Sequence, residues 1–89
     1  MANLKKPKDL EEELQEWYKE FLKLSTKLRD KENGGLIGKY FVLRDGKVVG
    51  HYDTFDTAYR SCLEQYDDQR FLIQELVPED YNNFVYVSS

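Results

Sequence analysis

Residues 38–55, GKYFVLRDGKVVGHYDTF, decide the fold. Two runs rich in β-branched and aromatic residues flank Asp45-Gly46, a dipeptide favoured in two-residue hairpin turns. The stretch predicts a β-hairpin with positive φ at both turn residues. It also predicts a register in which Leu43 opposes Val48, Phe41 opposes Gly50, Val42 opposes Val49 and Tyr40 opposes His51.

This register assigns the hairpin side chains to two faces. One face holds Phe41, Leu43, Val48 and Tyr52, and the other holds Tyr40, Val42, Val49 and His51. Both faces are substantially apolar, so each needs another element to cover it.

The residues after the hairpin predict a helix and one or two further strands. Thr54 or Asp53 is placed to cap a helix that runs to about Tyr66. Its expected inward residues are Phe55, Ala58, Tyr59, Cys62, Leu63 and Tyr66. A strand follows at residues 70–76, and residues 84–87, after Asn82-Asn83, could form a short fourth strand.

An amphipathic helix is predicted before the hairpin. Asp9 and Glu12 have the spacing of a capping box. An apolar seam then recurs at heptad spacing, and residues 33–35, Asn-Gly-Gly, end the helix in a flexible joint. The seam consists of Leu10, Leu14, Trp17, Phe21, Leu24 and Leu28.

The sequence therefore predicts an α+β fold, in which an N-terminal amphipathic helix precedes a ββαβ(β) unit with a small three- to four-stranded sheet. Residues 1–89 are expected to form a single domain, with a helical arm at 1–33 and a compact unit at 34–89.

Charge and cysteine content exclude several classes of protein. The chain of 89 residues has a formal net charge of −4, and residues 33–89 carry five basic against nine acidic side chains. Nucleic acid, which rewards clustered Lys and Arg, is an unfavourable partner. The single cysteine, Cys62, cannot form an internal disulfide, and no stretch resembles a signal peptide or a membrane span. A cytoplasmic protein with no membrane partner is expected.

The heptad seam is the main candidate interface. Folded back, it would cover a sheet face of its own chain or of a swapped copy; projected, it would form a coiled coil or bind a foreign partner. Trp17 and Phe21 are bulky for a two-stranded coiled coil, and their size therefore favours packing of the seam on a sheet of its own chain or of a swapped copy.

A smaller candidate site lies near the hairpin tip, where Tyr40, Arg44, Lys47 and His51 form a mixed basic and aromatic patch suited to a small anion or an acidic peptide. Charged residues that keep a hairpin tip soluble would give the same pattern.

Catalytic and metal sites are not expected. His51, Asp53 and Cys62 could suggest a nucleophile with its base, but Cys62 lies on the inward stripe of its helix. The carboxylates Asp53, Asp56, Glu64, Asp67 and Asp68 lack the spacing of a calcium loop. Neither an enzyme nor a cofactor is predicted, and the glycines at 34, 35 and 38 are expected to form a hinge.

The middle of the chain resembles a family of small bacterial and archaeal domains of unknown function. Residues 38–76 carry the resemblance: GKYFV at 38–42, VVGHYDTF at 48–55, Ala58-Tyr59, and FLIQ at 71–74. The resemblance implies a ββαβ unit and a prokaryotic or phage origin, and it implies no activity.

Three functions remain open at this stage. The first is a non-enzymatic protein–protein interaction module, a homodimer in which the seam and an uncovered sheet face form the interface. The second is a small-molecule or nucleotide-binding protein that uses the hairpin patch. The third is a phage-type inhibitor whose acidic half occupies a basic site on a host protein.

Overall fold

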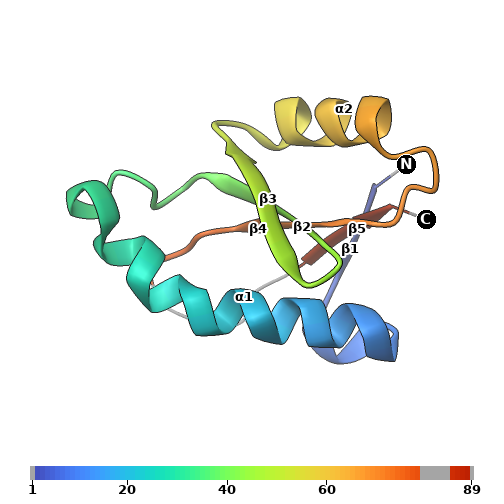
Figure 1. Ribbon diagram of the computed structural model, residues 1–89, viewed down its shortest axis with the longest axis horizontal. Coiled ribbons are helices and arrows are strands. Elements are labelled where there is room, and N and C mark those ends of the chain that lie inside the picture. The colour runs from blue at the N-terminus through green and yellow to red at the C-terminus, as the bar shows by residue number, and fades with distance from the viewer. Residues whose placement is uncertain (1, 79–84, 89) are drawn as a thin grey trace.

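A five-stranded antiparallel sheet lies between two helices in the computed structural model, which describes residues 2–78 and 85–88 (Figure 1). The strands are β1 (Ala2–Lys5), β2 (Tyr40–Arg44), β3 (Lys47–Tyr52), β4 (Leu72–Glu75) and β5 (Val85–Ser88), in the order β1-β5-β4-β2-β3. The helices are α1 (Glu12–Asp30) and α2 (Phe55–Gln65), with short 3-10 turns at Pro7–Asp9 and Lys31–Gly34. The predicted α+β class is confirmed, and β1 adds a strand that the sequence did not predict.

The hairpin forms where it was predicted, with one error in its register. Asp45 and Gly46 have φ of 54° and 77°, as a two-residue turn of this type requires. Leu43 opposes Val48 as expected, but Val42 then opposes Gly50, so that Val49 is an extra residue in a β-bulge. Val49 is consequently 49% exposed.

The bulge exchanges the faces of every β3 residue that follows it, because side chains alternate along a strand. The predicted pairing of Tyr40 with His51 is wrong: Tyr40 opposes Tyr52. Tyr52 packs on the α2 side of the sheet, and its hydroxyl lies 2.7 Å from that of Ser61 on α2. His51 instead contacts the ring of Phe41, at a centroid distance of 5.1 Å.

Helix α2 begins as the sequence predicted. The Thr54 hydroxyl accepts a hydrogen bond from the backbone N–H of Thr57, which is an N-cap interaction. Ala58 and Cys62 are buried beneath the helix, whereas Leu63, predicted to face inward, is exposed. Strand β4 and the described part of β5 agree with the two later predicted strands; Phe84, Asn82 and Asn83 lie outside the described residues.

Helix α1 covers the opposite face of the sheet, and its start differs from the prediction. The N-cap is Glu11, which makes no side-chain capping bond, while Asp9 lies in the preceding 3-10 turn. The buried stripe follows the period of 3.6 residues of an α-helix. After Phe21 it continues to Ser25, which is 0% exposed, so Leu24 is 41% exposed.

The segment after α1 is tied to the sheet. Glu32 and Asn33 have positive φ values of 53° and 54°, which end the helical conformation. The Gly38 N–H then donates to the Leu76 carbonyl at 2.8 Å, and the Leu76 N–H donates to the Lys39 carbonyl at 2.9 Å. These two bonds attach the expected hinge to the end of β4.

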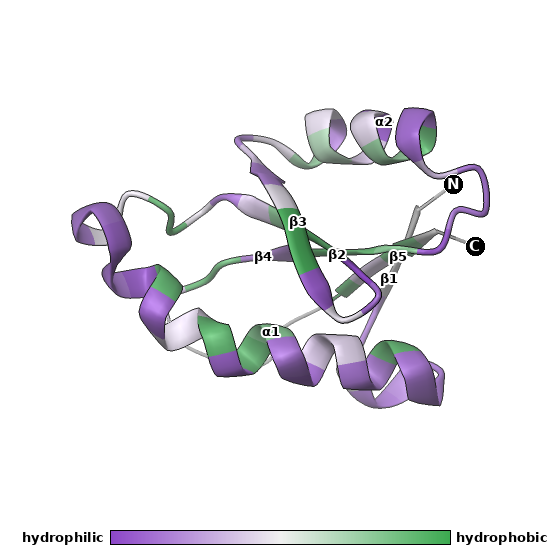
Figure 2. Cartoon of the chain, in the orientation of Figure 1, coloured by the Kyte–Doolittle hydropathy of each residue, from purple (hydrophilic) through white to green (hydrophobic). Residues whose placement is uncertain are grey.

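Two separate clusters of buried side chains form the core, one on each side of the sheet. Figure 2 shows apolar residues on the sides of the helices turned toward the sheet. The α1 cluster includes Trp17, Phe21, Phe41 and Leu72. The α2 cluster consists of Val42, Ala58, Cys62, Phe71 and Ile73, surrounded by partly buried aromatic rings. Both sheet faces are therefore covered within one chain.

Candidate functional site

The residues of the predicted interface are mostly used inside the chain. Leu10, Trp17 and Phe21 are buried in the α1 cluster, and Leu14 and Leu28 pack against it. Only Leu24 is left exposed. The seam thus covers a face of its own sheet, which was the first of the alternatives that the sequence left open, and it offers no continuous surface to a second chain.

The predicted ligand patch is not assembled. Tyr40 packs among the aromatic rings on the α2 side, whereas His51 lies against Phe41 on the α1 side. Lys47 is exposed on β3, an edge strand of the sheet. The register shift at Val49 is the physical reason, because it turns His51 away from Tyr40.

Arg44, the fourth member of that patch, is held by other residues. Its guanidinium donates two hydrogen bonds to Asp68, at 2.7 and 2.9 Å, and a third to the Arg70 carbonyl at 2.8 Å. It also lies 4.4 Å from the centroid of the Tyr66 ring. The hydrogen bonds from Arg44 and from the Arg70 backbone N–H lower the pKa of Asp68 to about 2. Arg44 therefore orders the turn before β4.

The candidate catalytic residues also lie apart. Cys62 is buried, and burial raises the pKa of its thiol to about 11, so the reactive thiolate is disfavoured. The carboxylate of Asp53 accepts a hydrogen bond from Lys39, which lowers the pKa of Asp53. His51 projects on the other side of the sheet from Cys62. Across the described residues, no cluster of three or more His, Cys, Asp or Glu side chains could hold a metal ion.

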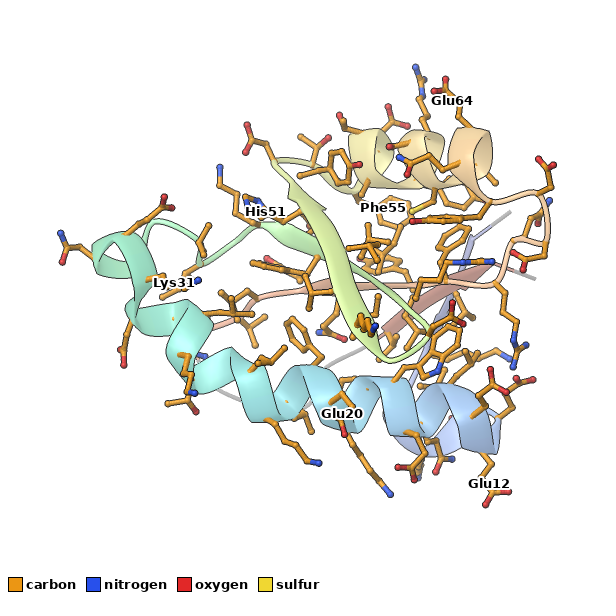
Figure 3. All side chains as sticks on the ribbon, in the orientation of Figure 1. Glu12, Glu20, Lys31, His51, Phe55 and Glu64 are labelled. Carbon is orange, nitrogen blue, oxygen red and sulfur yellow. The ribbon has the colours of Figure 1, made fainter. Side chains whose placement is uncertain are left out.

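The most distinctive surface is a group of half-buried rings at the junction of α2 and the sheet, which we term the aromatic face. Its members are Tyr40, Phe55, Tyr59 and Tyr86. Phe55 is at the centre, with ring centroids 6.2 Å from Tyr40, 5.6 Å from Tyr59 and 4.3 Å from Tyr86. Figure 3 shows Phe55 between α2 and the sheet, and Glu64 pointing away from it.

The aromatic face has an acidic neighbour. Glu75 is the register partner of Tyr40 on the adjacent strand β4. Burial, followed by the charge of Glu75 and by Tyr86, raises the pKa of the Tyr40 phenol. The phenol therefore remains neutral at physiological pH, beside a carboxylate. Sequence reasoning missed this face because nothing in the sequence indicates that Tyr86, on β5, meets Phe55 at the start of α2.

A pocket of about 490 Å³ lies at another place, where the start of α1 meets the turn before β4. We term it the α1 pocket. Arg70 at its rim is paired with Glu11 and Glu13 and lies 5.7 Å from the Trp17 ring. The pocket is lined by Lys5, Leu10, Glu11, Leu14, Asp67, Asp68, Gln69, Arg70, Phe71 and Val87.

Comparison of the chain with models of known protein families, with curated proteins and with solved structures gave no match. The resemblance to small prokaryotic domains thus stays a prediction. No helix within the described residues is both long and apolar enough to cross a membrane.

Proposed function

We propose that this protein is a non-enzymatic protein–protein interaction module that binds its partner through the aromatic face. The observation that carries the proposal is the contiguity of the four rings around Phe55, each of them half-buried. Tyrosine supplies a large apolar surface with a polar end, and for this reason it is enriched at protein interfaces.

The charge around the face indicates the kind of partner. Glu75 lies beside Tyr40, and Lys39, which precedes Tyr40 in the chain, is already paired with Asp53. The faces of tyrosine and phenylalanine rings attract cations, and a neighbouring carboxylate strengthens that attraction. The partner is therefore a protein segment that presents Arg or Lys, in agreement with the acidic balance of residues 33–89.

The test compares two charge reversals on the full chain. Glu75→Lys reverses the charge next to the aromatic face, and Glu64→Lys makes the same change on the outer side of α2. Each purified variant is immobilised, and the proteins it retains from an extract of its host are quantified by mass spectrometry.

The proposal requires a retained protein that Glu75→Lys loses and Glu64→Lys keeps. The purified partner must then bind more weakly as salt rises, because screening weakens attraction between charges. Identical sets of retained proteins for the wild type and Glu75→Lys would refute it.

A homodimer remains a second candidate, and a different observation favours it. Strand β3 is a free edge of the sheet, and it carries Val49, which at 49% is the most exposed large apolar residue among those whose side chains the structure describes. Antiparallel pairing of two β3 strands about Gly50 would place Lys47 of each copy opposite Asp53 of the other. The bulge at Val49 and the charge of Lys47 oppose such pairing, because both features protect edge strands.

Light scattering coupled to size exclusion decides between the candidates. A dimer that Val49→Lys converts to a monomer would establish β3 pairing. A wild-type monomer at high protein concentration would eliminate it and leave the aromatic face as the binding surface.

A further inference from the structure

The α1 pocket is independent of the aromatic face and has the size of a small-molecule site. Its volume, about 490 Å³, lies within the range of ligand-binding pockets in proteins. Leu10, Phe71 and Val87 are buried at its base, and Leu14 is partly buried beside them. The base of the pocket is therefore apolar.

Most of the charges at the rim are already neutralised by neighbours. Arg70 is bound to Glu11 and Glu13, and Asp68 is bound to Arg44. These pairs fix the walls of the pocket and leave little capacity for a ligand, since their hydrogen-bonding groups are occupied.

Two rim groups have no such neighbour in the described part of the chain. Within residues 2–78 and 85–88, the Lys5 ammonium and the Asp67 carboxylate take part in no ion pair or side-chain hydrogen bond. They come from distant parts of the chain, the end of β1 and the turn after α2. Among the described residues that line it, the pocket thus presents one free cation and one free anion above an apolar base.

We infer that the α1 pocket binds a small zwitterion with an apolar side group, of the free α-amino acid or dipeptide class. The ligand carboxylate would pair with Lys5, its ammonium group with Asp67, and its side group would contact Leu10 and Leu14. Pairing of both charges with the protein compensates for the water that each group loses on binding.

Nuclear magnetic resonance titration of the full chain tests the inference. Leucine and leucyl-leucine are the probes, and the methyl signals of Leu10, Leu14 and Val87 report on the pocket. At least one probe should give saturable shifts at these methyls. The absence of saturable shifts with both probes would refute the inference.

Two ligand analogues separate the roles of the two charges. N-acetylleucine lacks the cation, and leucinamide lacks the carboxylate. Lys5→Gln should weaken binding of N-acetylleucine by about two- to fivefold, the effect of an exposed ion pair, and should leave leucinamide binding unchanged. Asp67→Asn should produce the opposite pattern.

Lys27→Gln removes an exposed lysine in the last turn of α1, at the opposite end of the helix from the pocket, and serves as the matched control. Its affinity for both analogues should equal that of the wild type. Affinities that respond equally to Lys5→Gln and Lys27→Gln would show that general charge, and not the pocket, governs binding, and the inference would fail.

Discussion

The packing of α1 makes a prediction that separates two residues which the heptad pattern treats as equivalent. Phe21 is 2% exposed, and its ring lies 5.8 Å from that of Phe41. Leu24, the next residue of the heptad seam, is 41% exposed. Phe21→Ala should lower the free energy of unfolding by about 3–5 kcal/mol, because it removes the ring and leaves a cavity. Leu24→Ala should lower it by at most about 1 kcal/mol, since little buried surface is lost and alanine favours a helix.

The assay is urea denaturation followed by circular dichroism. A domain of this size is stable by about 5–13 kcal/mol, so Phe21→Ala could be largely unfolded without denaturant. Phe21→Leu provides a measurable alternative, with an expected cost of about 1–2 kcal/mol.

The reasoning would be refuted by equal losses for Leu24→Ala and Phe21→Ala. That result would mean that the heptad seam, and not the stripe of α1 seen here, is buried in solution. A urea concentration at the unfolding midpoint that rises with protein concentration would then identify a second chain as the partner of the seam.

Three further predictions follow from the turn, the buried thiol and the ion pair before β4. Gly46→Val should lower the free energy of unfolding by roughly 1 kcal/mol or more, because valine is strained at a φ of 77°. Gly50 lies outside the left-handed region, so Gly50→Ala should lower it less, as measured by thermal denaturation. The Cys62 thiol, with its pKa raised to about 11, should react with a bulky thiol reagent at pH 8 far more slowly in the native protein than in denaturant. The carboxylate of Asp68, with its pKa lowered to about 2 from an ordinary value of about 3.9, adds stability above about pH 4 that is lost as the pH falls. The unfolding free energies of the wild type and Asp68→Asn should therefore differ at neutral pH and converge near pH 2.

The sequence correctly predicted those parts of the fold that depend only on residues close together in the chain. Asp45-Gly46 predicted the turn, and Thr54 predicted the start of α2, because each acts through its own backbone or that of the next few residues. The burial of Cys62 followed from its position on an amphipathic helix.

The errors concern features that depend on distant residues. The bulge at Val49 could not be predicted because both registers bury apolar side chains from β2, and only the packing of Tyr52 under α2 distinguishes them. Ser25 is buried in place of the predicted Leu24. A heptad repeat has 3.5 residues per turn and a straight helix 3.6, and this difference accumulates along α1. Strand β1 has only four residues, and its pairing with β5 leaves no local trace.

The aromatic face and the α1 pocket could not be predicted from the sequence either, because each is formed by residues far apart in the chain. Tyr86 and Phe55 are separated by 31 positions, and nothing in either segment indicates that they meet. Lys5 and Asp67 line the same pocket only because the strand order brings β1 to that part of the sheet.

The position of β5 between β1 and β4 also bears on how the chain folds during its synthesis. Residues 2–5 leave the ribosome well before their strand partner, residues 85–88. Val85 and Val87, which help to cover the apolar side of α1, are made just as late. Until then Trp17 and Phe21 lack part of their cover, and such transiently exposed apolar surface is prone to aggregation and to capture by chaperones. The sheet is completed by insertion of its last strand, so folding of this domain is expected to finish only after synthesis has passed residue 88.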